Sequence, residues 1–125
     1  MSGAYRTALV TGATSGIGRA VAIALARAGL AVRAVGRDRD ALDALQVECG
    51  ATPVVLDVRD REGLSAIMSD QTIDVLVSNA GVLPTRDPFQ AIDPAAIDVM
   101  VETNFAAPIH LARLALPPMI RQGSR

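Results

Sequence analysis

Short apolar runs alternate along the chain with segments in which apolar residues recur at helical spacing. The apolar runs read as buried strands and cover Ala8–Val10, Ala31–Val35, Val54–Leu56 and Ile73–Val77. The segments of helical periodicity cover Ile17–Ala28, Asp38–Cys49, Glu62–Ser69 and a longer stretch from Asp93 toward Leu116. This alternation predicts an α/β fold of the doubly wound Rossmann type, with a parallel sheet and helices on both of its faces.

Several residues mark the expected helix ends. Gly29 and Gly50 tolerate positive φ and are natural stops for the first two helices. Asp93 followed by Pro94 is a strong helix start, and Pro117-Pro118 either ends that helix or lies near its last turn. We expect the inward face of the first helix to consist of Ile17, Val21, Leu25 and Ala28.

Composition narrows the class of protein. The chain has 125 residues, of which 50% are hydrophobic, and this suits one compact domain over residues 1–125. The formal net charge is −1, so charge gives no reason to expect nucleic acid or an anionic membrane as a partner. No apolar run approaches the roughly 20 residues that a membrane span needs.

Two further expectations concern the cellular compartment and metal binding. Cys49 is the only cysteine, so no internal disulfide can form, and we expect a cytoplasmic protein. No spacing of His, Cys or carboxylate residues suggests a metal site.

The stretch LVTGATSGIGRA, residues 9–20, places three glycines between the first strand and the first helix. Free N–H groups at a helix start favour an anion, and glycines allow the backbone to approach a pyrophosphate closely. The alternative is a tight turn that packs against the helix and holds no ligand. The spacing Gly-x₃-Gly-x-Gly differs from the G-x-G-x-x-G fingerprint, but because the loop lies between a strand and a helix, we favour a loop that binds a pyrophosphate.

Four motifs together resemble the short-chain dehydrogenase/reductase family. TGATSGIG, residues 11–18, resembles its TGxxxGxG cofactor loop, and Asn79-Ala80-Gly81 resembles its NAG motif. Asp57-Val58 resembles its adenine-side pair, and Asn104 resembles its active-site Asn. The motifs occur in the family's order and cover nearly the whole chain. One departure is Ser78, where the family usually has a further Asn.

The resemblance implies a set of site residues. The cofactor-binding residues carried over from the motifs are Gly12, Thr14, Ser15, Gly16, Ile17, Gly18, Asp57, Val58, Asn79, Ala80 and Gly81. Asp57 has an alternative role as a loop carboxylate that starts a helix.

Arg37 bears on the choice of nicotinamide dinucleotide. An acidic residue at the end of the second strand would bind the ribose hydroxyls of NAD(H), whereas a basic one would meet the 2′-phosphate of NADP(H). Gly36 and then Arg37 stand there, and Ser15 offers a further donor. We therefore predict NADP(H) over NAD(H). The alternative is that Arg37 is a solvated surface charge.

Pro108 follows Asn104 at i+4 and lacks the N–H that would normally donate to the Asn104 carbonyl. We expect this carbonyl to be freed and the helix to bend locally. In the family that the chain resembles, this Asn helps to hold a water that links a catalytic Lys to solvent. The alternative is a kink that only improves packing.

The Ser and the Tyr-x₃-Lys that the resemblance implies for catalysis are not found after these motifs. The chain ends at RQGSR, about where a fifth strand is expected. A strand order of 3-2-1-4 would leave the fourth strand as an unpaired apolar edge, which invites association. We therefore expect a Rossmann domain truncated after the helix that follows the fourth strand. A second chain, a cleaved remainder or another protein would complement it, in a homo- or hetero-oligomer.

Three functions are compatible with these features. The first is an NADP(H)-dependent reductase or dehydrogenase that acts on a small carbonyl or alcohol, with this chain as its cofactor-binding half. The second is a non-catalytic nucleotide-binding module. The third is an assembly subunit. The sequence does not identify the substrate.

Overall fold

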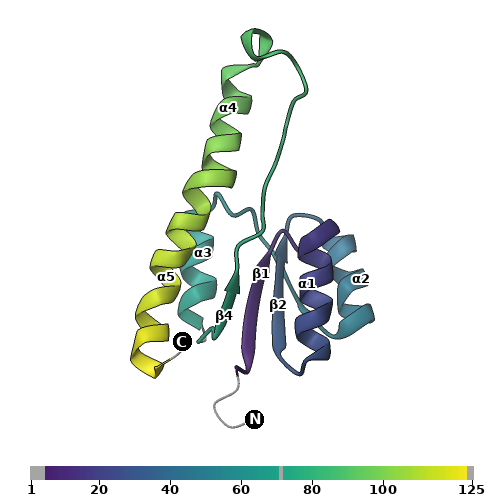
Figure 1. The fold of residues 1–125 in the computed structure, drawn as a ribbon, viewed down its shortest axis with the longest axis vertical. Helices are drawn as coiled ribbons and strands as arrows, with labels where there is room; N and C mark the ends of the chain where they lie inside the picture. Colours follow the sequence, from purple (N-terminus) through teal and green to yellow (C-terminus); the bar gives the residue numbers. More distant parts are fainter. Residues whose placement is uncertain (1–4, 71, 124–125) are drawn as a thin grey trace.

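The computed structural model describes residues 5–70 and 72–123 and shows one four-stranded parallel sheet (Figure 1). The strands are β1 (Thr7–Thr11), β2 (Ala31–Gly36), β3 (Thr52–Val55) and β4 (Val75–Val77). Their order in the sheet is β3-β2-β1-β4, which confirms the predicted order. The direction in which successive strands are added reverses between β1 and β4, and open α/β sheets form a crevice at such a point, at the carboxyl ends of their strands.

Helices cover both faces of the sheet, as the sequence pattern predicts. The helical elements are α1 (Gly16–Arg27), α2 (Arg39–Cys49), α3 (Arg61–Asp70), η1 (Phe89–Ala91), α4 (Pro94–Met100), η2 (Val101–Ala106) and α5 (Ala107–Gln122). Helices α1 and α2 lie on one face, and α3 and α5 lie on the other (Figure 1). Helix α4 projects beyond the sheet (Figure 1).

The core consists of two buried clusters, one on each face of the sheet. Ala8 and Val10 of β1 face α1 and α2, where they meet Leu42 and Leu45. Leu9, on the same strand, points to the opposite face and packs with the side chains of α3 and α5. This alternation follows from the twofold side-chain period of a strand, and it makes β1 the centre of the molecule.

The third strand differs from its predicted position. It begins at Thr52 and ends at Val55, so Pro53 lies inside the strand and not before it. Pro53 is paired with Ala34 on β2, and β3 is an edge strand. A proline is tolerated in an edge strand because its missing N–H can face away from the ladder.

The predicted inward face of α1 is wrong at its two ends. Ile17 is 74% exposed and Ala28 is also exposed, while Gly18 and Ala22 are the buried residues of the helix. The start of α1 packs too closely against the loop that precedes it to admit a branched side chain. A glycine and an alanine occupy these positions instead.

The long C-terminal helical segment contains an irregular turn. Residues Val101–Ala106 form a π-helix, and the Ala107 N–H donates to the Glu102 carbonyl at the i−5 position. Some irregularity was expected near Pro108, and it takes this form. Pro117 and Pro118 do not end the helix, which continues to Gln122 and stops at Gly123, with a φ of 75°.

An apolar stripe remains on the outside of this segment. Its members, which are 50–72% exposed, are Val101, Phe105, Ile109, Leu116 and Ile120. The opposite side of the segment faces the sheet through Thr103, Ala107, Leu111 and Ala115. We refer to the first set as the exposed apolar stripe.

Candidate dinucleotide-binding site

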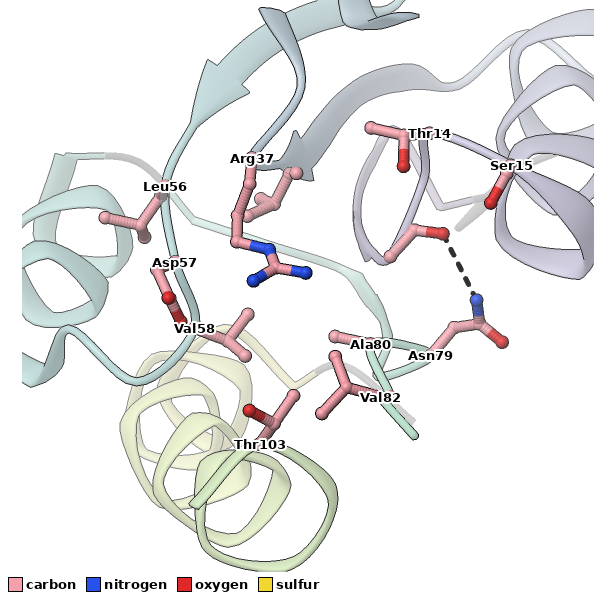
Figure 2. Close-up of a pocket in the computed structure, with 14 residues that line it drawn as sticks. Thr14, Ser15, Arg37, Leu56, Asp57, Val58, Asn79, Ala80, Val82 and Thr103 are labelled. Atoms are coloured by element: carbon pink, nitrogen blue, oxygen red, sulfur yellow. Dashed lines mark hydrogen bonds between the residues drawn. The ribbon is translucent and has the colours of Figure 1, made fainter. Parts of the chain in front are cut away.

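A cleft of about 260 Å³ lies at the carboxyl ends of the strands (Figure 2). Among the residues predicted for cofactor binding, its lining includes Gly12, Thr14, Ser15, Arg37, Asp57, Val58, Asn79, Ala80 and Gly81. These residues come from the loops after all four strands. The topology therefore gathers side chains that are up to 69 positions apart in the sequence into one cleft.

Gly12 and Gly18 hold the glycine loop close to its neighbours. A Cβ atom on Gly18 would lie 2.0 Å from the Gly12 carbonyl oxygen and 2.5 Å from Nδ2 of Asn79. A Cβ atom on Gly12 would lie 2.8 Å from the Cα atom of Ala80, and Gly12 has a φ of 63°. Both positions therefore require glycine, for close approach at Gly18 and for approach and conformation at Gly12.

The N-terminus of α1 opens beside this loop. Ser15 is the N-cap, but its side chain makes no capping hydrogen bond. Gly16, with a φ of 57°, and Ile17 follow at the exposed start of the helix, outside the cleft lining. The first N–H groups of α1 lack a side-chain acceptor from the cap, and such groups together with the helix dipole favour an anion.

Thr11 joins the first loop to the loop after β4. Its Oγ1 atom accepts hydrogen bonds from the backbone N–H groups of Asn79 (3.0 Å) and Ala80 (3.1 Å). Nδ2 of Asn79 donates in return to the Gly12 carbonyl at 3.2 Å (Figure 2). Our sequence analysis did not assign this role to Thr11. A fully buried hydroxyl at the end of a central strand is the signal that identifies it.

Arg37 and Asp57 flank the side of the cleft formed by the ends of β2 and β3. The Arg37 guanidinium points into the cleft, between Asp57 and Val58 on one side and Thr14 and Ser15 on the other (Figure 2). Asp57 pairs with Arg59 at 2.8 Å. Hydrogen bonds from the Arg59 side chain lower the pKa of Asp57, with a smaller contribution from the charge of Arg37.

Asn104 lies outside the cleft lining but is bonded to one of its members. Nδ2 of Asn104 donates to the Val82 carbonyl at 2.8 Å, and Oδ1 accepts from the Val82 N–H at 2.7 Å. The amide thus replaces a strand partner for Val82, and it ties the loop after β4 to η2. Its neighbour Thr103, which is 5% exposed, lines the cleft directly.

Other lining residues also escaped the sequence analysis. They are Val35, Leu56 and Thr103. Gly36, at the end of β2, also lines the cleft, and a Cβ atom there would lie 2.5 Å from Cγ2 of Thr14. The others are ordinary apolar or small residues whose role comes only from where the chain folds.

Metal binding and membrane crossing are two further possibilities for a chain of this kind. Within residues 5–70 and 72–123, no group of three or more His, Cys, Asp or Glu side chains is arranged to hold a metal ion. In the same residues, no helix has the length and apolar character that crossing a membrane requires.

With this geometry established, comparison with known proteins identifies the family. A model of the family described as short chain dehydrogenase matches residues 6–125. The chain belongs to the short-chain dehydrogenase family. The resemblance drawn from four short motifs is therefore confirmed over nearly the entire sequence.

Relatives within this family are oxidoreductases. The chain is 40% identical over 122 residues to L-xylulose reductase of Mus musculus, and the alignment covers 96% of this chain and 50% of the relative. It is 39% identical over 120 residues to D-erythrulose reductase of Gallus gallus, with 94% and 48% covered.

A solved structure supports the same assignment. A metagenomic short-chain oxidoreductase in complex with NADP superimposes with a TM-score of 0.87 and 32% identity, over 94% of this chain and 57% of the other. The chain spans about half the length of the curated relatives that it matches. As a short-chain dehydrogenase, it has the Rossmann-like fold of the family and lies among proteins that bind nicotinamide dinucleotides.

Proposed function

We propose that this chain is the NADP(H)-binding half of an oxidoreductase that transfers hydride between the nicotinamide and a small carbonyl or alcohol. The observation that carries the proposal is the position of Arg37. Its guanidinium points into a cleft whose other wall presents Thr14 and Ser15 (Figure 2). A planar fork of donors beside a hydroxyl suits a 2′-phosphate dianion, and no carboxylate occupies the end of β2.

The rest of the cleft suits the remainder of the dinucleotide. The close contact of Gly12 and Gly18 leaves a backbone surface for the pyrophosphate, beside the N–H groups of Gly16 and Ile17 at the start of α1. In this proposal Asp57 and Val58 meet the adenine ring. Asn79, Ala80 and Gly81 meet the other end of the cofactor, where they are held by Thr11.

A bound nicotinamide would supply the hydride to a carbonyl or accept it from an alcohol, and the chain's own contribution to the chemistry centres on Asn104. Its side chain is committed to Val82, so any contact with a catalytic group falls to its backbone carbonyl, which Pro108 at i+4 cannot bond. In our proposal this carbonyl orients a water for the catalytic Lys. The Ser, Tyr and Lys come from a further segment of polypeptide.

Exposed apolar surface supports the need for that segment. Within the described residues no strand pairs with the outer side of β4, and the exposed apolar stripe runs along the adjacent helix. An open strand edge and a contiguous apolar face are both features that proteins normally cover. We propose that a complementing segment or chain, in a homo- or hetero-oligomer, covers them. We propose the cytoplasm as the compartment, because Cys49 is the only cysteine.

The test compares the affinities of NADPH and NADH for the wild-type chain and for Arg37→Ala, by fluorescence titration. We expect NADPH to bind wild type more tightly, and Arg37→Ala to lose on the order of tenfold in NADPH affinity, with NADH nearly unchanged. Arg27→Ala is a matched control, because Arg27 is an exposed, paired arginine at the opposite end of α1. Equal loss for both dinucleotides in Arg37→Ala would contradict the phosphate role.

The exposed apolar stripe favours a second candidate, an assembly subunit that performs no chemistry. Hydride transfer measured with and without a partner chain that carries Ser, Tyr and Lys separates the two. Turnover that appears only with the partner supports the oxidoreductase. Binding of NADPH without turnover indicates a nucleotide-binding module, and no binding of either dinucleotide indicates the assembly subunit.

A further inference from the structure

Arg59 occupies the carboxylate of Asp57 almost completely. Its Nη2 atom donates to Oδ2 at 2.8 Å, and its Nε atom lies 3.2 Å from both Oδ1 and Oδ2. The backbone N–H of Arg59 adds a bond to Oδ1 at 2.9 Å. A carboxylate offers about four acceptor positions, so these contacts leave it with little capacity for another cation.

Arg37 stands in contrast to Arg59. Both Arg37 and Asp57 line the cleft, and the charge of Arg37 is felt at Asp57. Yet the side chain of Arg37 makes no hydrogen bond or ion pair within the part of the chain that the structure describes. Asp57 is the one acidic residue among those that line the cleft, and its carboxylate is hydrogen-bonded to Arg59.

We propose that Arg59 is a positioning residue that sets the preference for NADP(H) by neutralising Asp57. This inference rests on the proposed function, in which Arg37 binds the 2′-phosphate. Without Arg59, the carboxylate of Asp57 is free to pair with Arg37 and adds a negative charge beside the site of a phosphate dianion. Both effects weaken NADP(H) and leave NAD(H), which lacks the phosphate, almost untouched.

Glu102 is a second carboxylate that interacts with the arginines beside the cleft. Its carboxylate acts on the charge of Arg59 and pairs with Arg61 at 3.7 Å. The hydrogen bonds of the Arg59 side chain nevertheless go to Asp57, the carboxylate that lines the cleft. Arg61 remains available to balance Glu102 when Arg59 is replaced.

The experiment measures the affinities of NADPH and NADH for wild type, Arg59→Gln, Arg59→Lys and the double variant Arg59→Gln/Asp57→Asn, at low ionic strength. We expect Arg59→Gln to lower the ratio of NADPH to NADH affinity on the order of fivefold. Arg59→Lys keeps the charge and should retain most of the ratio. Arg27→Gln removes the same charge from a surface pair far from the cleft and should leave the ratio unchanged.

The double variant separates an action through Asp57 from a direct contact with the phosphate. If Arg59 acts by neutralising Asp57, removing the carboxylate restores the wild-type ratio. If the ratio stays low in the double variant, Arg59 touches the phosphate itself and the inference is wrong. A ratio in Arg59→Gln equal to that of wild type, or a Lys variant as poor as Gln, also overturns it.

Failure of the proposed function gives a different result. If wild type binds neither dinucleotide, or binds NADH as tightly as NADPH, the proposed function fails and this inference fails with it. If wild type prefers NADPH and Arg37→Ala abolishes the preference while Arg59→Gln keeps it, only this inference fails. An NMR titration of the Asp57 carboxyl without cofactor adds a second readout, and its pKa should rise in Arg59→Gln.

Discussion

The two sides of the molecule are packed to different degrees. On one side, α1 and α2 close over β1 and β2 with Leu42 and Leu45 fully buried. On the other side, α3 and α5 bury Leu64 and Leu111, but η1 and α4, which lie beyond the sheet, contain no buried residue, and Phe89 is 81% exposed. The first side has a core that the described residues complete among themselves. The second presents apolar surface that a further contact would cover.

The candidate site spans this divide. Gly12, Thr14, Ser15 and Arg37 belong to the well-packed side, whereas Asn104 belongs to the exposed segment. In the proposed function, most contacts to the dinucleotide come from the part of the chain that packs against a complete core. The groups nearest the chemistry depend on a region whose packing is unfinished within the described residues. The proposed function therefore predicts that dinucleotide binding can be separated from catalysis.

The largest effect should come from matched leucine truncations on the two sides. Leu45→Ala in α2 removes a fully buried side chain and should lower the free energy of unfolding by about 2–5 kcal/mol. Leu116→Ala in α5, where the leucine is 52% exposed, should change it by less than about 0.5 kcal/mol. Chemical denaturation measures both. The small effect is expected for the chain without a partner, and a large, concentration-dependent loss in Leu116→Ala would show instead that a second copy of the chain covers the exposed apolar stripe.

A methyl group at Gly18 should produce the next largest effect. Gly18→Ala places a Cβ atom 2.0 Å from the Gly12 carbonyl oxygen, and the overpacking should cost about 1–3 kcal/mol and abolish dinucleotide binding. Gly29→Ala, beyond the far end of α1, is the control, because no atom lies within 4 Å of a Cβ there and only the positive φ is strained. Thermal unfolding and NADPH titration report the two losses. Equal results for both variants would contradict the close approach.

Removing the Asn104 side chain should have a smaller and local effect. Asn104→Ala deletes two hydrogen bonds to the Val82 backbone, each with a net contribution of about 0.5–1.5 kcal/mol. Hydrogen exchange at the Val82 amide should speed up, while exchange in β1 stays slow. Asn104→Asp keeps the acceptor for the Val82 N–H and should protect it better than alanine does. Unchanged exchange at Val82 in Asn104→Ala would rule out this anchor.

The smallest expected effect is a loss of folding stability at low pH. Backbone N–H groups of Arg6 and Thr7, at 2.7 and 3.0 Å, lower the pKa of Asp74, and so does Nε2 of Gln122. A folded-state pKa below the unfolded value means that the unfolded chain takes up the proton first. The stabilisation is therefore complete above about pH 4 and is lost as pH falls through the folded pKa.

Denaturation of wild type and Asp74→Asn at pH 7 and pH 3 checks this prediction. The wild-type chain should lose more stability between the two pH values than the variant, because the variant has no proton to gain at this position. The same sign applies to Asp57, whose pKa is lowered by Arg59. Identical pH dependence in both chains would show that Asp74 contributes nothing through its ionisation.

The strands and turns could be predicted from local signals, and most of the residues that line the cleft from motifs that resemble those of a known family. Apolar runs and glycines identify strands and turns, and Asp38 and Asp93 each cap a helix through a side-chain oxygen, as such residues do. Thr11 and Thr103 escaped because their roles depend on contacts with segments distant in the sequence. Ile17 was misassigned for a related reason. Its helical period places it inward, but the closeness of α1 to the glycine loop leaves room only for Gly18.

The π turn at Val101–Ala106 determines how α4 is rotated about the helix axis relative to α5. Such a turn holds one residue more than an α-helical path would, and each residue of a helix corresponds to about 100° of rotation. Deleting a single residue here would allow a continuous α-helix and would rotate α4 about the axis of α5. The Asn104 amide would then no longer face Val82. The two hydrogen bonds that hold the loop after β4 therefore depend on the extra residue of the π turn.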